Sequence, residues 1–219
     1  MYNKLGKETN VAYLTHDDYY KDISHLSYEE RSQTNFDHPD SLDTNLLIQH
    51  VAQLKNEGQK KSVNVPIYDF TTHSRLKDRV KVVEPKSIIL VEGILIFSDE
   101  ELVNLLDLKV FVDADSDVRL IRRISRDVAE RGRSINSVMD QYTTTVRPMH
   151  NMFVEPSKQV ADIIVHDAIN PVVLNMICNY LISAVGVDID IDENAITTTT
   201  TTTCSGSDID EECTVSGAT

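Results

Sequence analysis

The chain has 219 residues, of which 41% are hydrophobic and 26% charged, with a formal net charge of −14 at pH 7. These totals are typical of a soluble globular protein with one sizeable core. They argue against a membrane protein, because no apolar run approaches the roughly 18 residues of a span and the first residues lack the apolar stretch of a signal peptide.

The acidic residues are concentrated at the C-terminal end. From residue 188 onward there are eight acids and no Lys or Arg, and the remainder holds 27 acids and 21 bases, a net charge of −6. With this negative net charge, the rest of the chain should not bind nucleic acid through its overall electrostatic field. The tail also contains seven consecutive threonines at 197–203. We therefore predict one domain over 1–187 and a disordered tail over 188–219.

Three cysteines without metal-binding spacing fit a reducing compartment, so we expect a cytoplasmic protein. The first predicted elements are a strand at 10–15, a polar loop, a helix capped by Ser41 or Asp43 and running through Glu57, and a β-hairpin at 63–83. Pro66 indicates that the first arm of the hairpin is an edge strand.

The second half of the chain alternates strands with helices. Apolar runs predict strands at 87–93, 109–112 and 161–166, and helical patterns follow at 94–106, 113–133, 134–155 and 171–185. Within the second of these helices we expect Ser116 at the N-cap. Apolar strands that alternate with helices predict an α/β fold, with a parallel sheet covered by helices on both faces and the hairpin as an excursion.

The helical segment predicted at 113–133 is rich in arginine. Arg119, Arg122, Arg123 and Arg126 recur at helical spacing and share one face, and Arg131 and Arg133 follow. A solvated helix face is the plain alternative. The guanidinium fork matches phosphate oxygens, however, so we predict phosphate binding here.

Two carboxylates stand at the ends of predicted strands. Asp17 follows the first strand, with Asp18, Tyr19 and Tyr20 beside it, and Glu92 ends another. Paired carboxylates at neighbouring strand ends are typical of Mg²⁺-dependent phosphoryl transfer, although both could simply cap helices.

Polar and aromatic residues also gather in the two irregular segments. These are Asp37, Tyr68, Phe70 and His73. Together they could hold a planar base and a sugar diol, although each taken singly could be structural.

Several motifs resemble the uridine–cytidine kinase family of P-loop kinases, in order and at similar spacing over about residues 9–186. They are THDDYYKD, NFDHPDSLD, VPIYDFTTHSR, ILVEGILIF, VFVDADSDVRLIRRISRDVAERGR and QYTTTVRP. The resemblance implies transfer of a phosphate from ATP or GTP to the 5′-hydroxyl of uridine or cytidine in pyrimidine salvage, with Mg²⁺. It also suggests a homotetramer.

The resemblance also implies roles for individual residues near the reacting groups. Asp17 would be the catalytic base and, with Glu92, a metal-shell carboxylate. Arg126 and Arg131 would approach the donor phosphates, and Tyr20 would lie beside Asp17 in the nucleoside pocket.

The remaining implied roles concern the nucleoside itself. Asp37 would bind the ribose diol, and Tyr68, Phe70 and His73 would recognise the base. Arg123 and Arg133 would lie near the nucleoside and its 5′ end, and Gln141 would complete the sugar contacts.

One departure from the family pattern is large. The printed sequence lacks the Walker A motif G-x-x-x-x-G-K-[ST] and the strand before it; at Gly6-Lys7 the following residue is Glu8 instead of Ser or Thr. In the family that strand is central to the sheet, so its loss should leave a gap in the core. A smaller departure is Ile169, where relatives often carry an acid.

Two readings of this departure stay open at the level of sequence. The first is a uridine–cytidine kinase whose sequence here is truncated and whose activity is impaired. The alternative is a non-catalytic, nucleoside-binding paralogue that regulates active relatives. A kinase for another small alcohol is a weaker third reading, because the YDF-x-x-HSR hairpin favours a pyrimidine nucleoside.

Overall fold

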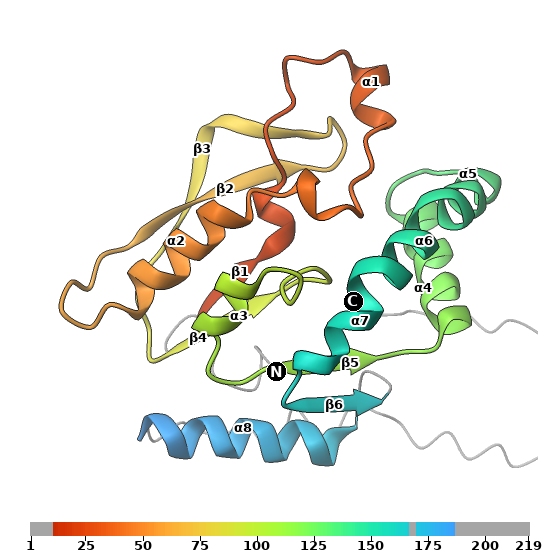
Figure 1. The fold of residues 1–219 in the computed structure, drawn as a ribbon. Coiled ribbons are helices and arrows are strands. Elements are labelled where there is room, and N and C mark those ends of the chain that lie inside the picture. Colours follow the sequence, from red (N-terminus) through yellow and green to blue (C-terminus); the bar gives the residue numbers. More distant parts are fainter. Residues whose placement is uncertain (1–10, 167–169, 187–219) are drawn as a thin grey trace, which may run out of the picture.

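The computed structural model describes residues 11–166 and 170–186 (Figure 1). Its strands are β1 (Val11–Thr15), β2 (Val63–Asp69), β3 (Ser74–Val83), β4 (Ile88–Glu92), β5 (Val110–Asp113) and β6 (Ile163–His166). The longer helices are α2 (Thr44–Lys55), α4 (Ser116–Ala129) and α8 (Pro171–Val185). This order confirms the predicted alternation of strands and helices.

The described strands form three separate pairs. β1 and β4 are parallel and in register from Val11 opposite Ile88 to Thr15 opposite Glu92. β5 and β6 are also parallel, whereas β2 and β3 form the predicted antiparallel hairpin. The predicted α/β class is confirmed. Within the described residues β4 and β5 are not paired with each other.

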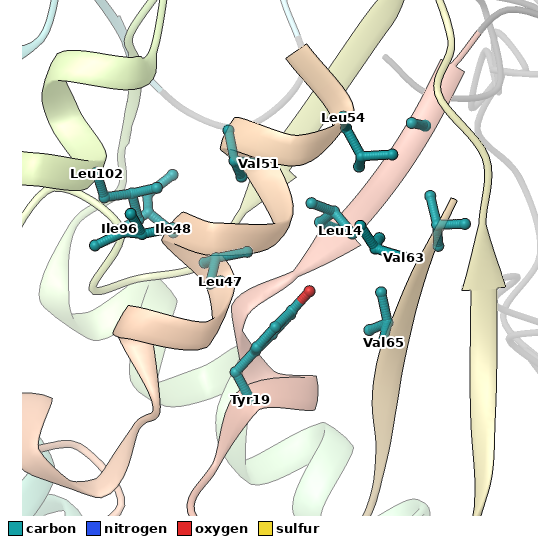
Figure 2. Close-up of a cluster of buried hydrophobic side chains, with 12 residues drawn as sticks. Leu14, Tyr19, Leu47, Ile48, Val51, Leu54, Val63, Val65, Ile96 and Leu102 are labelled. Carbon is teal, nitrogen blue, oxygen red and sulfur yellow. The ribbon is translucent and has the colours of Figure 1, made fainter. Parts of the chain in front are cut away.

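Helices cover both faces of the β1–β4 pair. Successive side chains of a strand point to opposite faces, so one strand can contact both helices. Ala12 and Leu14 of β1 pack with α2, which contributes Leu47, Val51 and Leu54, as Figure 2 shows for the labelled members. Val11 of β1 and Ile88 of β4 pack instead against Cys178 of α8. The regular alternation of buried contacts places α2 and α8 on opposite sides of the pair.

Several helix ends differ from the sequence prediction. The α2 helix is capped by Asp43, as predicted, but it ends at Lys55, so the prediction that it continues through Glu57 was wrong. The backbone turns at Asn56, whose side chain accepts from the Gly58 N–H. The N-cap of α4 is Asp115, and Ser116 is already its first helical residue.

Shorter elements complete the fold. The first segment after β1 is a 3₁₀ turn, η2 (His16–Tyr19), and a short helix, α1 (Tyr28–Ser32), lies in a segment predicted to be turns. The helix predicted over 134–155 is a continuous series of helical turns that begins with α5 (Ile135–Gln141). Two stretches in its middle, Tyr142–Val146 and His150–Val154, are π-helical. The C-terminal tail lies outside the described residues.

The helix α3 (Glu100–Leu105) follows a turn after β4, and its start is fixed by Asp99, whose side chain accepts from the Leu102 N–H. None of the helices in the described ranges is long and apolar enough to cross a membrane.

Candidate active site

Asp17 lies in η2, immediately beyond the carboxyl end of β1. The hairpin fixes this turn, because Arg75 of β3 donates to the carbonyl oxygens of Tyr20 (2.6 Å) and Tyr19 (3.0 Å). Arg75 also pairs with Asp43 at the start of α2 (3.3 Å). The buried Tyr19 hydroxyl lies 2.9 Å from His50 Nδ1 on α2. Asp17 is thus held by the sheet, the hairpin and α2 together.

The surroundings of Asp17 are both desolvated and charged. Burial raises the pKa of its carboxyl to about 6, the negative charge of Glu92 adds to this, and Arg131 and Arg126 oppose it. A carboxyl with such a pKa can take up or release a proton near neutral pH. This is the behaviour expected of a general base.

Glu92 stands at the end of β4, opposite Thr15 in register. Its side chain is exposed and accepts a hydrogen bond from the Tyr13 hydroxyl (3.0 Å). Water therefore reaches the Glu92 carboxylate at the end of the strand. Asp17 and Glu92 nevertheless interact, so the structure brings the two predicted carboxylates to one edge of the sheet.

An aromatic cluster lies beside Asp17. The ring of Tyr20 contacts Phe36 (centroids 5.3 Å apart) and Tyr68 (5.0 Å). His73 stacks on Phe36 with centroids 5.2 Å apart and rings inclined by 16°. The cluster thus joins the segment after η2 to β2 and to the turn of the hairpin, and the flat faces needed to hold a planar group are present.

Two features of this cluster are unusual for purely structural residues. Tyr68 is 5% exposed, yet its hydroxyl has no hydrogen-bond partner within the described structure. His73 has a φ of 51°, in the left-handed region that side chains seldom adopt. Buried unsatisfied polar groups and strained backbone are costly and cluster at functional sites.

Phe70 marks the outer edge of the cluster. It is 42% exposed, packs edge-on against Tyr68 (5.3 Å between centroids), and lies under the guanidinium of Arg131 (5.3 Å). This cation–π contact links the hairpin to the arginine-rich segment after α4. Arg131, Arg133 and Arg31 together lower the pKa of His73 after the larger effect of burial, so its ring is neutral near pH 7.

The arginines are organised by a residue that sequence reasoning missed. Asp127 on α4 is 0% exposed, and its carboxylate pairs with four guanidinium groups. These belong to Arg126 (2.8 Å), Arg131 (3.4 Å), Arg133 (3.5 Å) and Arg123 (3.7 Å). The signal was available, because Asp127 stands four residues from both Arg123 and Arg131 and so faces them on a helix.

Gln141 of α5 holds two members of this group in place. Its Oε1 accepts from Arg123 Nη2 (3.0 Å) and from Arg133 Nη1. Arg123 in turn lies near Asp37. Burial raises the pKa of the Asp37 carboxyl, and the charge of Arg123 is the main influence that lowers it. Asp37, Arg123, Arg133 and Gln141 therefore form one polar wall.

The predicted site residues fall into one region. Burial is the main cause of the raised pKa of the Tyr20 hydroxyl. The pKa is also affected by four neighbouring side chains, namely Asp17, Asp37, Tyr68 and Arg131. Arg119 is different, because its Nε donates to the Ala114 carbonyl at the start of α4. Ile169 lies outside the described residues.

Besides Asp127, sequence reasoning missed Phe36, Arg75 and Arg31. Arg31 of α1 donates to the Thr72 carbonyl (2.7 Å) and so ties the hairpin turn to the segment after η2. These contacts join segments about 40 to 55 residues apart, which no local pattern reveals.

Comparisons with known proteins show the family of this chain. The model of the phosphoribulokinase / uridine kinase family matches residues 2–192. A uridine kinase of Clostridium novyi is 53% identical over 159 residues, covering 73% of this chain and 74% of the relative. A uridine kinase of Streptococcus uberis is 48% identical over 175 residues, covering 80% and 81%.

The fold is also that of solved kinases. Phosphoribulokinase from Rhodobacter spheroides superposes with a TM-score of 0.54 at 14% identity, covering 72% of this chain and 60% of that one. Such low identity shows the fold alone, whereas the family follows from the sequence matches. By the family match and these two relatives, the chain belongs to the phosphoribulokinase / uridine kinase family, which consists of kinases.

Proposed function

We propose that this protein is a kinase for the transfer of the γ-phosphate of ATP or GTP to the 5′-hydroxyl of uridine or cytidine, a reaction that the 219 printed residues carry out poorly because they lack the Walker A motif. The single observation that carries the proposal is the placement of Asp17. Its carboxyl, with a pKa of about 6, interacts with Arg131 and Arg126 of the group held by Asp127 and with Tyr20 of the aromatic cluster. An acceptor alcohol and a donor phosphate can therefore meet at this carboxylate.

The nucleoside would occupy the space bounded by the aromatic cluster and the polar wall. A pyrimidine ring would lie against the faces of Tyr20, Phe36 and His73, and the unpartnered Tyr68 hydroxyl would gain a hydrogen bond. Asp37 accepts hydrogen bonds from vicinal hydroxyls when ionised, and Arg123 beside it favours that form. The names of the close relatives support uridine as the substrate.

The reaction needs a base, because an alcohol is a weak nucleophile near neutral pH. The Asp17 carboxylate would accept the 5′-hydroxyl proton as the oxygen attacks phosphorus and the bond to the nucleoside diphosphate breaks. Arg126 and Arg131 would balance the charge on the transferring phosphoryl group. Asp127 would not touch the substrate; it positions these guanidinium groups.

The residues present fit a magnesium ion that comes with the nucleotide. Asp17 and Glu92 repel one another, and a divalent cation between them would relieve this repulsion. No group of three or more possible metal ligands occurs among the described residues. That suits Mg²⁺, which takes one or two carboxylates together with water and phosphate oxygens. The ion would supply charge neutralisation at the phosphates.

The experiment compares Asp17→Asn with Asp18→Asn in a version of the chain that carries a family-type strand and Walker A loop before residue 10. Asp17→Asn keeps the size of the side chain but cannot accept the proton, so kcat should fall by about 10²–10⁴ while uridine affinity changes little. The cation acting on Asp18 is Lys81 of the hairpin, not the clustered arginines, so Asp18→Asn should be milder. The reverse order would refute Asp17 as the base.

A further inference from the structure

The turn between β2 and β3 holds His73 in a strained conformation, with a φ of 51°. Such a conformation costs free energy and persists only where the surrounding structure fixes it. The turn supplies part of this support itself, because Asp69 accepts from the Thr71 N–H (2.9 Å) and from the Thr72 hydroxyl (2.7 Å). The groups that fix the turn therefore decide where the His73 ring lies.

Further support comes from the short helix α1, which lies beside this turn (Figure 1). Arg31 on this helix donates from Nη1 to the carbonyl oxygen of Thr72 (2.7 Å), and Thr72 directly precedes His73. The ring of Tyr28, also on α1, lies 6.0 Å from the ring of His73 between centroids. The helix α1 thus holds the backbone before His73 and contacts its ring.

The guanidinium of Arg31 also brings a positive charge to this end of the aromatic cluster. Arg31 has a larger effect on the pKa of His73 than any other charged group does. Burial raises the pKa of the Tyr68 hydroxyl to about 12, and Arg31 is the charged group that opposes this rise. The polar edge of the cluster, formed by His73 and Tyr68, therefore faces a cation.

This polar edge favours a ligand atom that accepts hydrogen bonds. An arginine can only donate, whereas a neutral imidazole and a tyrosine hydroxyl can each donate or accept. The buried Tyr68 hydroxyl has no partner among the described residues, so a ligand group beside it would satisfy it. A ligand atom with a partial negative charge would also be attracted to the nearby guanidinium of Arg31.

The two pyrimidine nucleosides differ in the group that they carry at position 4 of the ring. Uracil has a carbonyl oxygen there, which accepts hydrogen bonds, and cytosine has an amino group, which donates them. The carbonyl oxygen fits an edge next to a cation, whereas the amino group would face a side chain that cannot accept. A site whose polar groups hydrogen-bond one ligand rejects an analogue that leaves those groups unpaired.

We propose that Arg31 is a specificity-determining residue of the nucleoside site, which holds the His73 turn through the Thr72 carbonyl and favours uridine over cytidine. Arg31 acts through its charge and through the position of His73, and it has no part in the transfer of the phosphate. The inference rests on the function proposed above, because it takes the aromatic cluster to be the place of the base.

The test measures the binding of three nucleosides to the 219-residue chain by calorimetry. They are uridine, cytidine and the riboside of pyrimidin-2-one, whose ring carries only hydrogen at position 4. Since one hydrogen bond contributes about 0.5–1.5 kcal/mol, we expect uridine to bind about 10-fold more tightly than each of the other two. Equal affinities for uridine and cytidine would overturn the proposal.

The variant Arg31→Met removes the charge and the hydrogen bond to Thr72 but keeps a long side chain. The ratio of uridine affinity to cytidine affinity should fall from about 10 to below about 3. Arg31→Lys keeps the charge and can donate to the same carbonyl, so it should retain most of the ratio. If Arg31→Met weakened both nucleosides by the same factor, Arg31 would only support the turn, and the proposal would fail.

Arg79→Met is the matched control. Arg79 is exposed and lies on β3, six residues beyond His73, so this variant removes the same charge from the hairpin without touching the turn. Its ratio should equal that of the native chain; an equal fall in both methionine variants would mean that overall charge sets the ratio, against the proposal. If the native chain bound none of the three nucleosides, the proposed nucleoside site itself would be refuted, and this inference with it.

Discussion

Gly93 and His16 approach so closely that a Cβ atom on Gly93 would lie 2.5 Å from the His16 Cβ. His16 directly follows β1, and Gly93 directly follows β4. The absence of a side chain at Gly93 therefore lets the ends of the two strands meet. Because Asp17 and Glu92 are the chain neighbours of these residues, this contact also sets the separation of the two carboxylates.

Gly93→Ala should destabilise the fold. The added methyl group would meet a side chain that is 1% exposed and cannot move aside, which costs about 1–3 kcal/mol. Urea denaturation of the variant should give a lower midpoint with an unchanged m value. Gly58→Ala is the matched control, because its Cβ would meet only Asn56 Oδ1 at 3.4 Å. Equal midpoints for the two variants would contradict the proposed contact.

Asp127→Asn should loosen the arginine cluster. The variant loses the charge that four guanidinium groups share, and hydrogen bonds to charged groups are worth about 1.5–3 kcal/mol. The arginines keep part of their solvation, so we expect a loss of stability in the lower half of this range. The free energy of unfolding of the variant should also depend less on salt concentration than that of the native chain.

Glu130→Gln is the control for this experiment. Glu130 lies three residues from Asp127 and is exposed, so its removal changes the net charge equally without touching the cluster. If both variants lost the same stability, the effect would come from overall charge and not from the buried carboxylate. Thermal unfolding at low and high ionic strength distinguishes the two causes.

Much of the fold could be predicted because its signals are local. The short runs at 10–15, 87–93, 109–112 and 161–166 and the hairpin at 63–83 predicted the six strands of the described residues, and Asp43, one of two candidate caps, marks the start of α2. The errors lie at ends, where side-chain hydrogen bonds decide. Asn56 turns the chain at the end of α2, and Asp115 instead of Ser116 takes the N-cap position of α4.

The site could be predicted only in part. Single residues such as Asp17 and His73 could be singled out from their place in the sequence, and the family resemblance implied their roles, but the groups that hold them come from distant segments. Phe36 meets His73, and Arg75 fixes the backbone of Tyr20, through contacts that sequence spacing does not reveal. Asp127 was missed because a single acid within a basic run looks like a charge-balancing surface residue.

His73 should contribute to nucleoside binding through its ring. His73→Asn keeps a residue that tolerates a positive φ but removes the ring that stacks on Phe36. We expect uridine affinity, measured by calorimetry, to fall about 10-fold, since aromatic stacking contributes about 0.5–1.5 kcal/mol and a hydrogen bond is lost as well. His25→Asn, at an exposed position outside the cluster, should bind uridine as the native chain does.

The 219-residue chain should show little transfer of phosphate to uridine. The printed sequence contains no Walker A motif, whose backbone amides and lysine hold the donor phosphates in related kinases. A radiolabelled ATP assay should therefore give a rate well below about 1 s⁻¹, the lower end for kinases. Uridine binding should persist, because the aromatic cluster is complete within the described residues. An ordinary kinase rate would reveal a different donor site.

Asp17 should make the stability of the fold depend on pH. Its folded-state pKa is raised from 3.8 to about 6, so the folded protein holds this proton more tightly than the unfolded chain. The free energy of unfolding contributed by Asp17 is therefore fully present below about pH 4 and is lost as the pH rises through 6. Asp17→Asn removes the buried charge, so the variant should be more stable than the native chain at pH 7.

The measurement is the difference in unfolding free energy between Asp17→Asn and the native chain from pH 4 to pH 8. This difference should be small at pH 4 and should grow in favour of the variant up to about pH 7. Taking a difference matters because burial also lowers the pKa of His16 to about 4, and that effect cancels. Asp22→Asn is the control: hydrogen bonds from Ser24 lower the pKa of Asp22 below its ordinary value of 3.8, so its contribution changes only below about pH 4, and its difference from the native chain should stay constant from about pH 5 to pH 8. A difference independent of pH would mean that Asp17 is not desolvated in the folded protein, and its role as a base near neutral pH would lose its physical support.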